Sequence, residues 1–376
     1  MAPTSDSLPG DEGLATGGQA SDGKYHSRAA GSRLVEGGEA MTTLVDVARR
    51  AGVSTMTVSR VINDSGYASK ETRARVNEAI AELGYMPNSL ARQLRSKQTK
   101  TIALVVTDIR NPFFTTIASG VEDTARARHY AVMFCNTYES EIEEAQYVRV
   151  LIERRVDGVL LVPAGGAGSS VRLLQDRHMP TVVLDRHVRD TEVDEVRAES
   201  KSGAYAAVNH LIGLGHRRIA VLAGPEGVST STDRVAGYRE ALLEACPAGD
   251  CGSILFGEFN EASGYTMTCQ ILQAKPRPTA IFAANNFIAF GALRALREAG
   301  LSIPEDISMV VFDDLPPGWV LDPFLTVVSQ PAYEVGTQAA ELLLQRLAGE
   351  VCDGPHSIIL PSELIVRRST APPRPD

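Results

Sequence analysis

The sequence predicts an all-α helix-turn-helix headpiece, followed by a larger α/β domain of two lobes. Three observations lead to this prediction. Two short helical patterns meet at Gly52, between Thr43 and Asn63. From Thr101 onward, short apolar runs alternate with helical stretches, which is typical of parallel sheets covered by helices. A long interruption at 188–201 divides these runs into two sets and indicates two lobes.

The first helix of the headpiece has apolar residues at helical spacing, namely Leu44, Val47, Ala48 and Ala51. Gly52 suits the left-handed end of that helix, and Ser54 is a good N-cap for the next one. In the second helix Val58, Val61 and Ile62 share one face. The other face is small, polar and uncharged except for one arginine, a surface that the DNA major groove admits; it comprises Thr55, Met56, Thr57, Ser59 and Arg60.

A third helix over 70–83, capped by Ser69 and ended by Gly84, completes a minimal core. Pro87 suits the start of a further short helix, over 88–95. That helix lacks a broad apolar face with which to join a core. We expect it to be marginal in isolation, because helices this short are barely stable in water.

Three motifs of this region resemble the LacI/GalR family of bacterial transcription repressors. They are VDVARRAGVS (45–54), TVSRV (57–61) and GYMPNSLARQL (84–94). The resemblance extends from about Thr43 to Thr370. It implies a DNA-binding headpiece over 41–86, a hinge helix and linker over 87–100, and an effector-binding and dimerisation domain over 101–376. The implied N-lobe comprises about 101–200 and 331–358, and the C-lobe about 201–328 and 360–376.

Charge is distributed unevenly along the 376 residues. The formal net charge is −9, which argues against a generally basic nucleic-acid binder. Residues 41–100, however, contain ten basic and five acidic side chains. A small cationic module therefore accompanies an acidic body, so the module can bind phosphate while the body discourages indiscriminate adhesion.

The remaining compositional features indicate a cytoplasmic protein without a metal or cofactor, and the resemblance to DNA-binding repressors implies that it is nucleoid-associated. The five scattered cysteines have no C-x-x-C spacing, which favours reduced thiols. No apolar run is long enough to cross a bilayer, and no signal-peptide h-region opens the chain. Residues 1–40 are rich in Gly, Ser, Ala and acid, so we expect them to be disordered. We also expect translation to start at Met41, because GGE at 37–39 would be encoded by a purine-rich, ribosome-binding stretch.

In the body, the first set of expected strands is 101–106, 131–135, 158–162 and 181–184, and the second is 218–223, 253–256, 279–284, 307–312 and 326–329. The intervening stretches predicted as helices include 120–129, 143–154, 203–214, 234–245 and 290–299. Ligands of such folds bind outside the carboxyl ends of the strands. Polar and aromatic residues gather at these positions: Asn111, Phe113, Phe114, Asp185, Arg186, Arg234, Phe259, Asn285, Asp313 and Gln330.

Carboxylates, amides and guanidinium groups beside aromatic faces are the chemistry of sugar capture. Any single Asp or Asn after a strand is a common turn former, but their joint occurrence favours a site. The body resembles the periplasmic-binding-protein-like (type I) core of the family, with the pattern of its ribose-type members. The resemblance implies that Phe113, Phe114 and Phe259 sandwich a sugar ring. The implied hydroxyl-binding residues are Asp185, Arg186, Arg234, Asn285 and Asp313.

One departure is Asn286, which stands where many relatives have an acid. It removes a charge near the pocket and leaves the identity of the sugar open. Three other features are expected to have no ligand role or an undecided one. The motif GHRR (215–218) is expected to be structural, the glycines of 165–168 to form a loop, and Trp319 either to lie on the pocket rim or to pack.

The resemblance implies a palindromic double-stranded DNA operator bound by a homodimer. Thr55 and Met56 would touch base edges, and Ser54 and Ser69 would hold phosphates. Paired hinge helices would enter the minor groove, with Leu94 wedged into a base step. The complete predicted DNA surface is Ser54, Thr55, Met56, Thr57, Ser59, Arg60, Asn63, Ser69, Tyr85, Asn88, Ala91, Leu94 and Arg95.

The expected function is therefore repression of a carbohydrate-utilisation operon, relieved by a small sugar such as ribose, another pentose or a nucleoside. Corepression, activation and response to a phosphoprotein use the same architecture and stay open. A free sugar-binding protein would need a signal peptide and no headpiece, and an enzyme would need a cofactor fingerprint or catalytic dyad. The chain's last residues show no heptad pattern, which favours a dimer over a tetramer.

Overall fold

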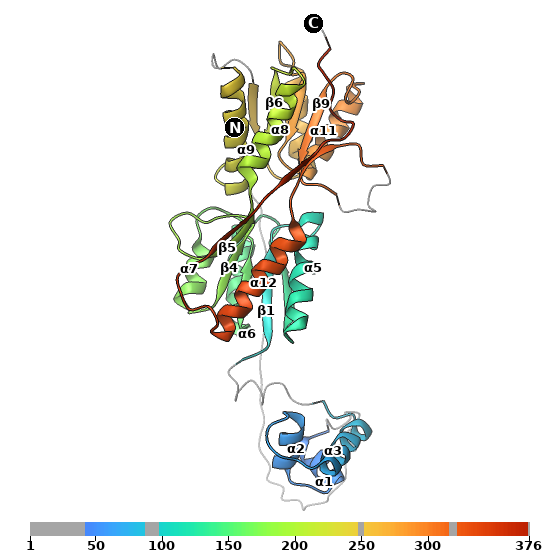
Figure 1. Ribbon diagram of the computed structural model, residues 1–376, viewed down its shortest axis with the longest axis vertical. Helices are drawn as coiled ribbons and strands as arrows, with labels where there is room; N and C mark the ends of the chain where they lie inside the picture. The colour runs from blue at the N-terminus through green and yellow to red at the C-terminus, as the bar shows by residue number, and fades with distance from the viewer. Residues whose placement is uncertain (1–41, 87–97, 247–251, 316–321, 375–376) are drawn as a thin grey trace, which may run out of the picture. The chain divides into compact units, whose positions relative to one another are not determined.

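The computed structural model describes residues 42–86, 98–246, 252–315 and 322–374 (Figure 1). It divides into a headpiece unit, residues 1–88, and a body, residues 89–376, which are described separately here. The expected disorder of 1–40, the hinge helix with Asn88, Ala91, Leu94 and Arg95, and the placement of Trp319 lie outside the described residues.

The headpiece has three helices, α1 (Leu44–Ala51), α2 (Thr55–Ile62) and α3 (Lys70–Leu83). Their ends are determined locally, as the sequence predicts. Gly52 and Gly84 end α1 and α3 with φ of 67° and 58°, in the left-handed region that glycine tolerates. Ser54 and Ser69 cap α2 and α3 by accepting from a backbone N–H three residues on. Fully buried Val47, Val58 and Val76, one from each helix, form the centre of the core.

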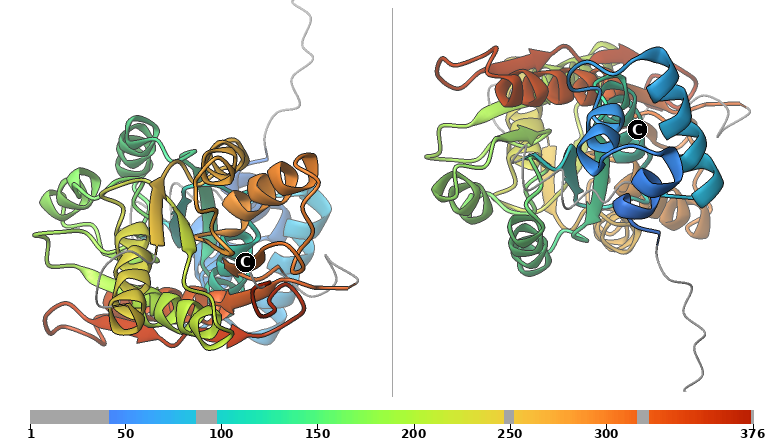
Figure 2. Two further views of the ribbon diagram at one scale, coloured as in Figure 1. Left: turned by 90° about the horizontal axis from the view of Figure 1, so that it is seen from above. Right: turned by 90° about the horizontal axis from the view of Figure 1, so that it is seen from below.

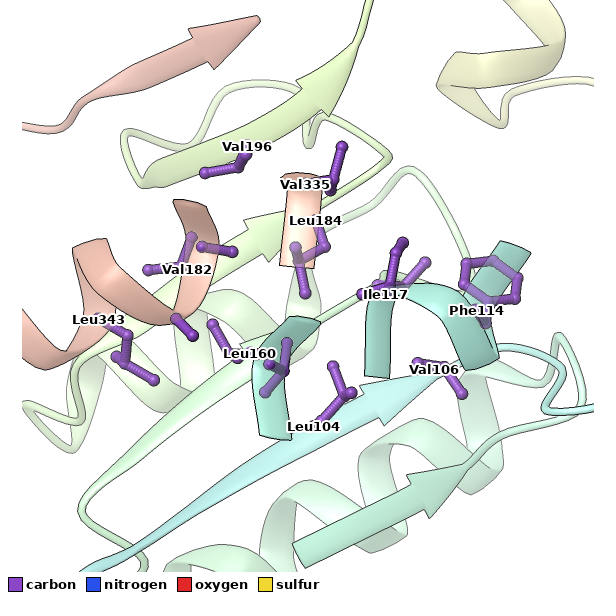
Figure 3. Packing of buried hydrophobic residues seen from close by; sticks show 14 of the residues in the cluster. Leu104, Val106, Phe114, Ile117, Leu160, Val182, Leu184, Val196, Val335 and Leu343 are labelled. Atoms are coloured by element: carbon purple, nitrogen blue, oxygen red, sulfur yellow. The ribbon is translucent and has the colours of Figure 1, made fainter. Parts of the chain in front are cut away.

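The N-lobe of the body is a six-stranded parallel sheet in the order β11-β5-β4-β3-β1-β2. Its strands are β1 (Thr101–Val106), β2 (Ala131–Asn136), β3 (Gly158–Leu161), β4 (Thr181–Leu184), β5 (Asp194–Ala198) and β11 (Ser357–Leu360). Helices α5 (Pro112–Ala127) and α12 (Ala332–Ala348) cover one face, and α6 (Glu141–Arg154) and α7 (Ser169–Asp176) cover the other. Figure 3 shows Leu104, Leu160 and Leu184 of the sheet packed among Ile117, Val335 and Leu343 of α5 and α12.

The C-lobe repeats this plan, with a sheet in the order β12-β10-β9-β8-β6-β7. Its strands are β6 (Ile219–Ala223), β7 (Gly252–Phe256), β8 (Ala280–Ala283), β9 (Ser308–Phe312), β10 (Thr326–Ser329) and the antiparallel β12 (Glu363–Ile365). Helices α8 (Ser200–Gly213) and α9 (Ser229–Ala245) cover one face, and α10 (Glu261–Leu272) and α11 (Asn286–Glu298) cover the other. The end-on views in Figure 2 show helices on both sides of the body's sheets.

The described chain passes between the two lobes three times: from β5 to α8, from β10 to α12, and from β11 to β12. The last passage is visible in Figure 1 as the dark red segment that runs between the sheets. Each lobe is therefore assembled from separate stretches of sequence, and every passage is short. Such a set of connections lets the lobes rotate about a common hinge.

Neighbouring helices of the body touch through glycines. A Cβ atom on Gly120 of α5 would lie 2.2 Å from the carbonyl oxygen of Tyr333, and one on Gly336 of α12 would lie 2.2 Å from that of Ile117. Glycine is required at both positions because the two backbones approach too closely for any side chain. The two helices lie side by side in Figure 1.

Three expectations need correction. The interruption at 188–201 contains the strand β5, whose alternating buried and half-buried residues include charged side chains. The helix expected over 120–129 already begins at Pro112, because Asn111 caps it and proline is accommodated in the first turn. Cys246 is disulfide-bonded, so the expectation of reduced thiols is wrong for this residue, whereas Cys135, Cys269 and Cys352 are free.

The motif at 215–218 has the expected structural role. The buried His216 ring lies 2.8 Å from the Thr279 hydroxyl, 3.1 Å from that of Ser308 and 2.9 Å from the Ala371 carbonyl oxygen. These contacts tie the chain's last described segment to the C-lobe sheet. Burial lowers the pKa of His216, which favours the neutral ring. None of the described helices combines the length and apolar character needed to span a membrane.

Candidate functional site

Several of the predicted DNA-contacting side chains lie on or beside α2, where some contact one another. Met56 is 65% exposed, and an Nη of Arg60 lies 3.7 Å from its sulfur. The Asn63 amide donates to the carbonyl oxygen of Ser59 at 2.7 Å, which closes the end of the helix. Ser54, Thr55 and Ser69 are exposed, whereas Thr57 and Ser59 are half-buried.

Several arginine side chains of the headpiece form ion pairs. Arg50 pairs with Glu82 at 2.6 Å, and Arg73 pairs with Asp64 at 2.6 Å. Arg60 forms no ion pair among the described residues, so its guanidinium is available for a phosphate or a base edge. Tyr85 is only 8% exposed and packs in the headpiece core. Its ring therefore stabilises the three-helix unit, and its predicted contact with DNA stays a prediction.

The body contains a pocket between the two lobes, and all ten predicted effector residues line it: Asn111, Phe113, Phe114, Asp185, Arg186, Arg234, Phe259, Asn285, Asp313 and Gln330. The same pocket is lined by four further residues, Asp108, Glu139, Thr230 and Phe287. Its cavity volume is about 20 Å³, enough for a water-sized group. In this conformation, called the closed conformation here, the lobes meet beside the pocket, where Asn286 of the C-lobe donates to Asn111 of the N-lobe at 3.0 Å.

Helix starts position the two asparagines. The Asn111 side-chain oxygen accepts from the backbone N–H of Phe113 at 3.0 Å, and that of Asn285 accepts from Ile288 at 2.8 Å. Because both side-chain oxygens serve as N-caps, the amide NH₂ groups are left to donate. The site thus offers two donors that are held in place by the first turns of α5 and α11.

Two of the three pocket aspartates sit at strand ends in left-handed backbone conformations, with φ of 61° at Asp185 and 75° at Asp313. Such conformations are uncommon for residues with a side chain and cluster at functional sites. Asp185 belongs to the N-lobe and Asp313 to the C-lobe. Gln330 donates to Asp313 at 2.5 Å, while the nearest cation to Asp185 is Arg186, whose Nε lies 3.8 Å away.

Burial shifts the protonation of this cluster. It raises the pKa of Asp185 to about 6, against the opposing effect of Arg186 and Arg234. Burial also raises the pKa of Asp313 and lowers that of Arg234. Two buried carboxylates from opposite lobes thus lie near Arg234, which forms no ion pair among the described residues.

Arg234 and Arg186 are held by the protein in different ways. An Nη of Arg234 donates to the carbonyl oxygen of Ala284 at 2.6 Å, and its guanidinium lies 3.8 Å from the centre of the Phe312 ring. Arg186 forms two 2.7 Å hydrogen bonds with Glu139 and one of 2.8 Å with the Pro163 carbonyl oxygen. Both guanidinium groups are oriented before any ligand arrives.

Several buried polar atoms of the pocket have no hydrogen-bond partner. They are the Nε atoms of Arg186 and Arg234 and the side-chain oxygen of Gln330. Buried donors and acceptors are almost always satisfied in proteins. The unpaired atoms of Arg186, Arg234 and Gln330 are therefore available to a polar group in the pocket.

Asn286, the departure noted in the sequence, connects the lobes. Its amide donates to the side-chain oxygen of Asn111 at 3.0 Å, and both residues are buried. An aspartate at 286 would place a carboxylate against that oxygen, which already accepts a hydrogen bond from Phe113. The neutral amide is therefore suited to the closed conformation.

Aromatic rings complete the pocket. Phe113 and Phe114 meet edge to face with centroids 5.2 Å apart, and Phe259 lies across from them on the C-lobe. Gly224 makes room for Phe259, since a Cβ there would lie 2.2 Å from the ring.

Four lining residues are not among the ten predicted effector residues, although the sequence places Asp108 with them in the polar stretch after the first expected strand. Asp108 follows β1 as the predicted residues follow their strands, whereas Thr230 and Phe287 lie in the first turns of α9 and α11. Glu139 gave no signal at all, because its role depends on pairing with Arg186, far along the chain.

Comparison with known proteins agrees with this architecture. Residues 43–88 match the lacI family of bacterial regulatory proteins, and residues 99–368 match the periplasmic binding proteins and sugar binding domain of the LacI family. The chain is 38% identical to the HTH-type transcriptional repressor PurR of Vibrio atlanticus, covering 82% of this chain and 92% of the relative. It is 37% identical to the ribose operon repressor of Halalkalibacterium halodurans, covering 88% and 97%.

The solved structure of the lac repressor dimer bound to operator and the anti-inducer ONPF is similar over 88% of this chain and 99% of its own, with 31% identity and a TM-score of 0.77. The headpiece and the two-lobed body thus match the two parts of the LacI family in order, over residues 43–88 and 99–368. The chain belongs to the LacI family of bacterial transcription regulators.

Proposed function

We propose that the protein represses a carbohydrate-utilisation operon and that a small neutral sugar, ribose or a similar pentose or nucleoside, releases it from a palindromic operator. The interlobe pocket is the observation on which this proposal rests. It combines four phenylalanine rings with amide, carboxylate and guanidinium groups, the combination that recognises a polyhydroxylated ring. Similarity to a ribose operon repressor supports the choice of ribose.

The charge of the pocket supports a neutral ligand. Glu139 binds Arg186, and Arg110 binds Asp108 through a 2.7 Å ion pair. Arg234 is then left with Asp185 and Asp313, both buried. A phosphate or carboxylate would add negative charge to this cluster, whereas sugar hydroxyls can donate to the carboxylates and accept from the guanidinium.

A homodimer is part of the proposal, because a palindrome presents two half-sites related by a twofold axis. The N-lobe sheet ends at β2, whose Met133 and Phe134 are each 36% exposed. An edge strand with exposed large apolar residues is suited to being covered by a second copy. Analytical ultracentrifugation tests this: Met133→Glu is expected to weaken the dimer, and a monomeric unaltered protein would contradict the proposal.

Release of DNA is proposed to follow from linkage. If the sugar binds one lobe arrangement more tightly than the other, it shifts the equilibrium between them by that difference. A coupling of about 1–3 kcal/mol corresponds to about 5- to 150-fold in operator affinity. The hinge helices, including Leu94, Ala91 and Arg95, would be the element that responds.

The direct test measures operator binding with and without sugars. Fluorescence anisotropy of a labelled palindromic duplex is recorded with ribose, other pentoses, hexoses and nucleosides. We expect ribose or a close analogue to weaken binding at least fivefold. Tighter binding with the cognate sugar would establish corepression instead, and a protein that ignores every duplex would refute the DNA-binding role.

A further inference from the structure

We propose that Glu139 is a positioning residue for the effector, which turns one edge of the Arg186 guanidinium toward two adjacent sugar hydroxyls. The inference rests on the proposed sugar-binding function and adds to it a residue and a selectivity. Glu139 lines the pocket and forms two hydrogen bonds of 2.7 Å with the terminal nitrogens of Arg186.

The geometry of a guanidinium group determines which donors remain free. Its five N–H bonds form a planar fork. Glu139 accepts from Nη1 and Nη2, which share one edge, and the Pro163 carbonyl oxygen accepts from Nη1 at 2.8 Å. Both N–H bonds of Nη1 are therefore engaged in hydrogen bonds. The Nε–H and the second Nη2–H are left, and they lie together on the adjacent edge of the plane.

This remaining edge is buried and next to a pocket acid. Arg186 is 4% exposed, and its Nε has no hydrogen-bond partner. The nearest carboxylate oxygen, on Asp185, lies 3.8 Å from Nε, too far for a direct hydrogen bond. Two neighbouring hydroxyl groups present oxygens at a spacing that such a two-pronged edge can bind, and one of them can donate on to Asp185.

The turn that carries Glu139 is constrained. Tyr138 and Glu139 have φ of 52° and 59°, two consecutive side-chain-bearing residues in the left-handed region. The Glu139 backbone N–H donates to the Thr107 carbonyl oxygen at 3.1 Å, and Ser140 then caps α6. Residues persist in such conformations only where the surroundings hold them there, and this turn places the Glu139 carboxylate at the pocket.

Calorimetric titration of the full-length protein with D-ribose, 2-deoxy-D-ribose and 3-deoxy-D-ribose tests the assignment. We expect the unaltered protein to bind ribose at least about tenfold more tightly than one of the deoxy sugars, because a deoxy sugar leaves a buried donor of Arg186 unpaired. Glu139→Ala should reduce this ratio to within about threefold of unity. Glu139→Gln should reduce the same ratio at least threefold. This variant provides the test if the alanine variant does not fold.

Two comparisons make the test specific. Glu143→Ala removes a carboxylate from an exposed position of α6 and should leave the ratio unchanged. Arg186→Lys removes the fork, and the double variant with Glu139→Gln should be no less selective than Arg186→Lys alone, because both changes affect one interaction.

The possible failures are distinguishable. A ratio that stays above tenfold in folded Glu139 variants overturns the assignment, and so does an equal loss of affinity for all three sugars. If the unaltered protein binds none of them, the proposed ribose effector is wrong, and this assignment fails with it.

Discussion

Replacing Arg234 with alanine tests the link between the pocket and the operator. The Arg234 side chain is 3% exposed, and its guanidinium is oriented by Ala284 and by the ring of Phe312. It is the pocket cation that has no carboxylate bound to it, and its Nε lacks a partner in the described structure. We therefore expect it to contribute directly to sugar affinity.

The magnitude follows from the donors that alanine removes. A hydrogen bond to a charged group contributes about 1.5–3 kcal/mol. Two such bonds from Arg234 to the sugar would amount to about 3–6 kcal/mol, or a loss of about 10²- to 10⁴-fold in affinity. Alanine also leaves Asp185 and Asp313 facing each other without this cation, so their pKa values should rise further and both should be protonated more readily.

The assay combines calorimetry with ribose and anisotropy with operator DNA. Arg234→Ala should lose measurable ribose binding and release by ribose, while it retains operator affinity without sugar within about threefold, since the substitution lies in the body. Arg239→Ala, an exposed arginine on the same helix α9, is the matched control. Ribose affinity that survives in a folded Arg234→Ala protein would refute the role in sugar binding, and loss of operator binding would refute the separation of the two functions.

Three further predictions concern pH, packing and DNA. Because burial raises the folded-state pKa of Asp185 to about 6 from 3.8, this residue stabilises the fold below about pH 4 and loses that contribution as the pH rises through 6. The Tm of the unaltered protein relative to Asp185→Asn should therefore fall between about pH 4 and 6 and stay level above that range, and parallel profiles in differential scanning fluorimetry would contradict the burial argument. Gly336→Ala should destabilise the body by about 2–4 kcal/mol in urea denaturation, because its Cβ would lie 2.2 Å from a backbone oxygen of α5. Gly213→Ala is the control, since no atom lies within 4 Å of its Cβ position, and it should be neutral or stabilising. Equal destabilisation by the two substitutions would exclude the close contact as the cause. Leu94→Ala should weaken operator binding about 10- to 100-fold in anisotropy titrations and leave ribose affinity unchanged, since the base-step wedge is lost; an unchanged operator affinity would argue against that wedge.

Local chemistry made the headpiece predictable. Helix ends at Gly52, Ser54, Ser69 and Gly84 depend on backbone conformation and on hydrogen bonds within a few residues, and the structure confirms each of them. The apolar periodicity likewise identified the buried faces. The burial of Tyr85 was not predicted, because its place in a motif gives no information on whether the ring points into the core or away from it.

Features that depend on distant residues were not predictable. β5 contains Asp194, Glu195 and Arg197, and such a charged sequence is typical of a loop. In the structure, Asp194 forms a 2.8 Å ion pair with Arg346, which lies far along the chain. Glu139 is a further example, since neither its backbone conformation nor its partner is encoded nearby. The ten effector residues could be found together because parallel strands bring their carboxyl ends to one edge, so position after a strand predicts proximity.

The three passages of chain between the lobes have a consequence for shortened forms of the protein. A chain ended after β10 would lack α12 and β11 of the N-lobe as well as β12 of the C-lobe, so a stop codon at that point damages both lobes at once. Neither lobe could be expressed from one uninterrupted gene fragment. A cut near residue 98 is different, because everything that builds the two sheets lies on its far side.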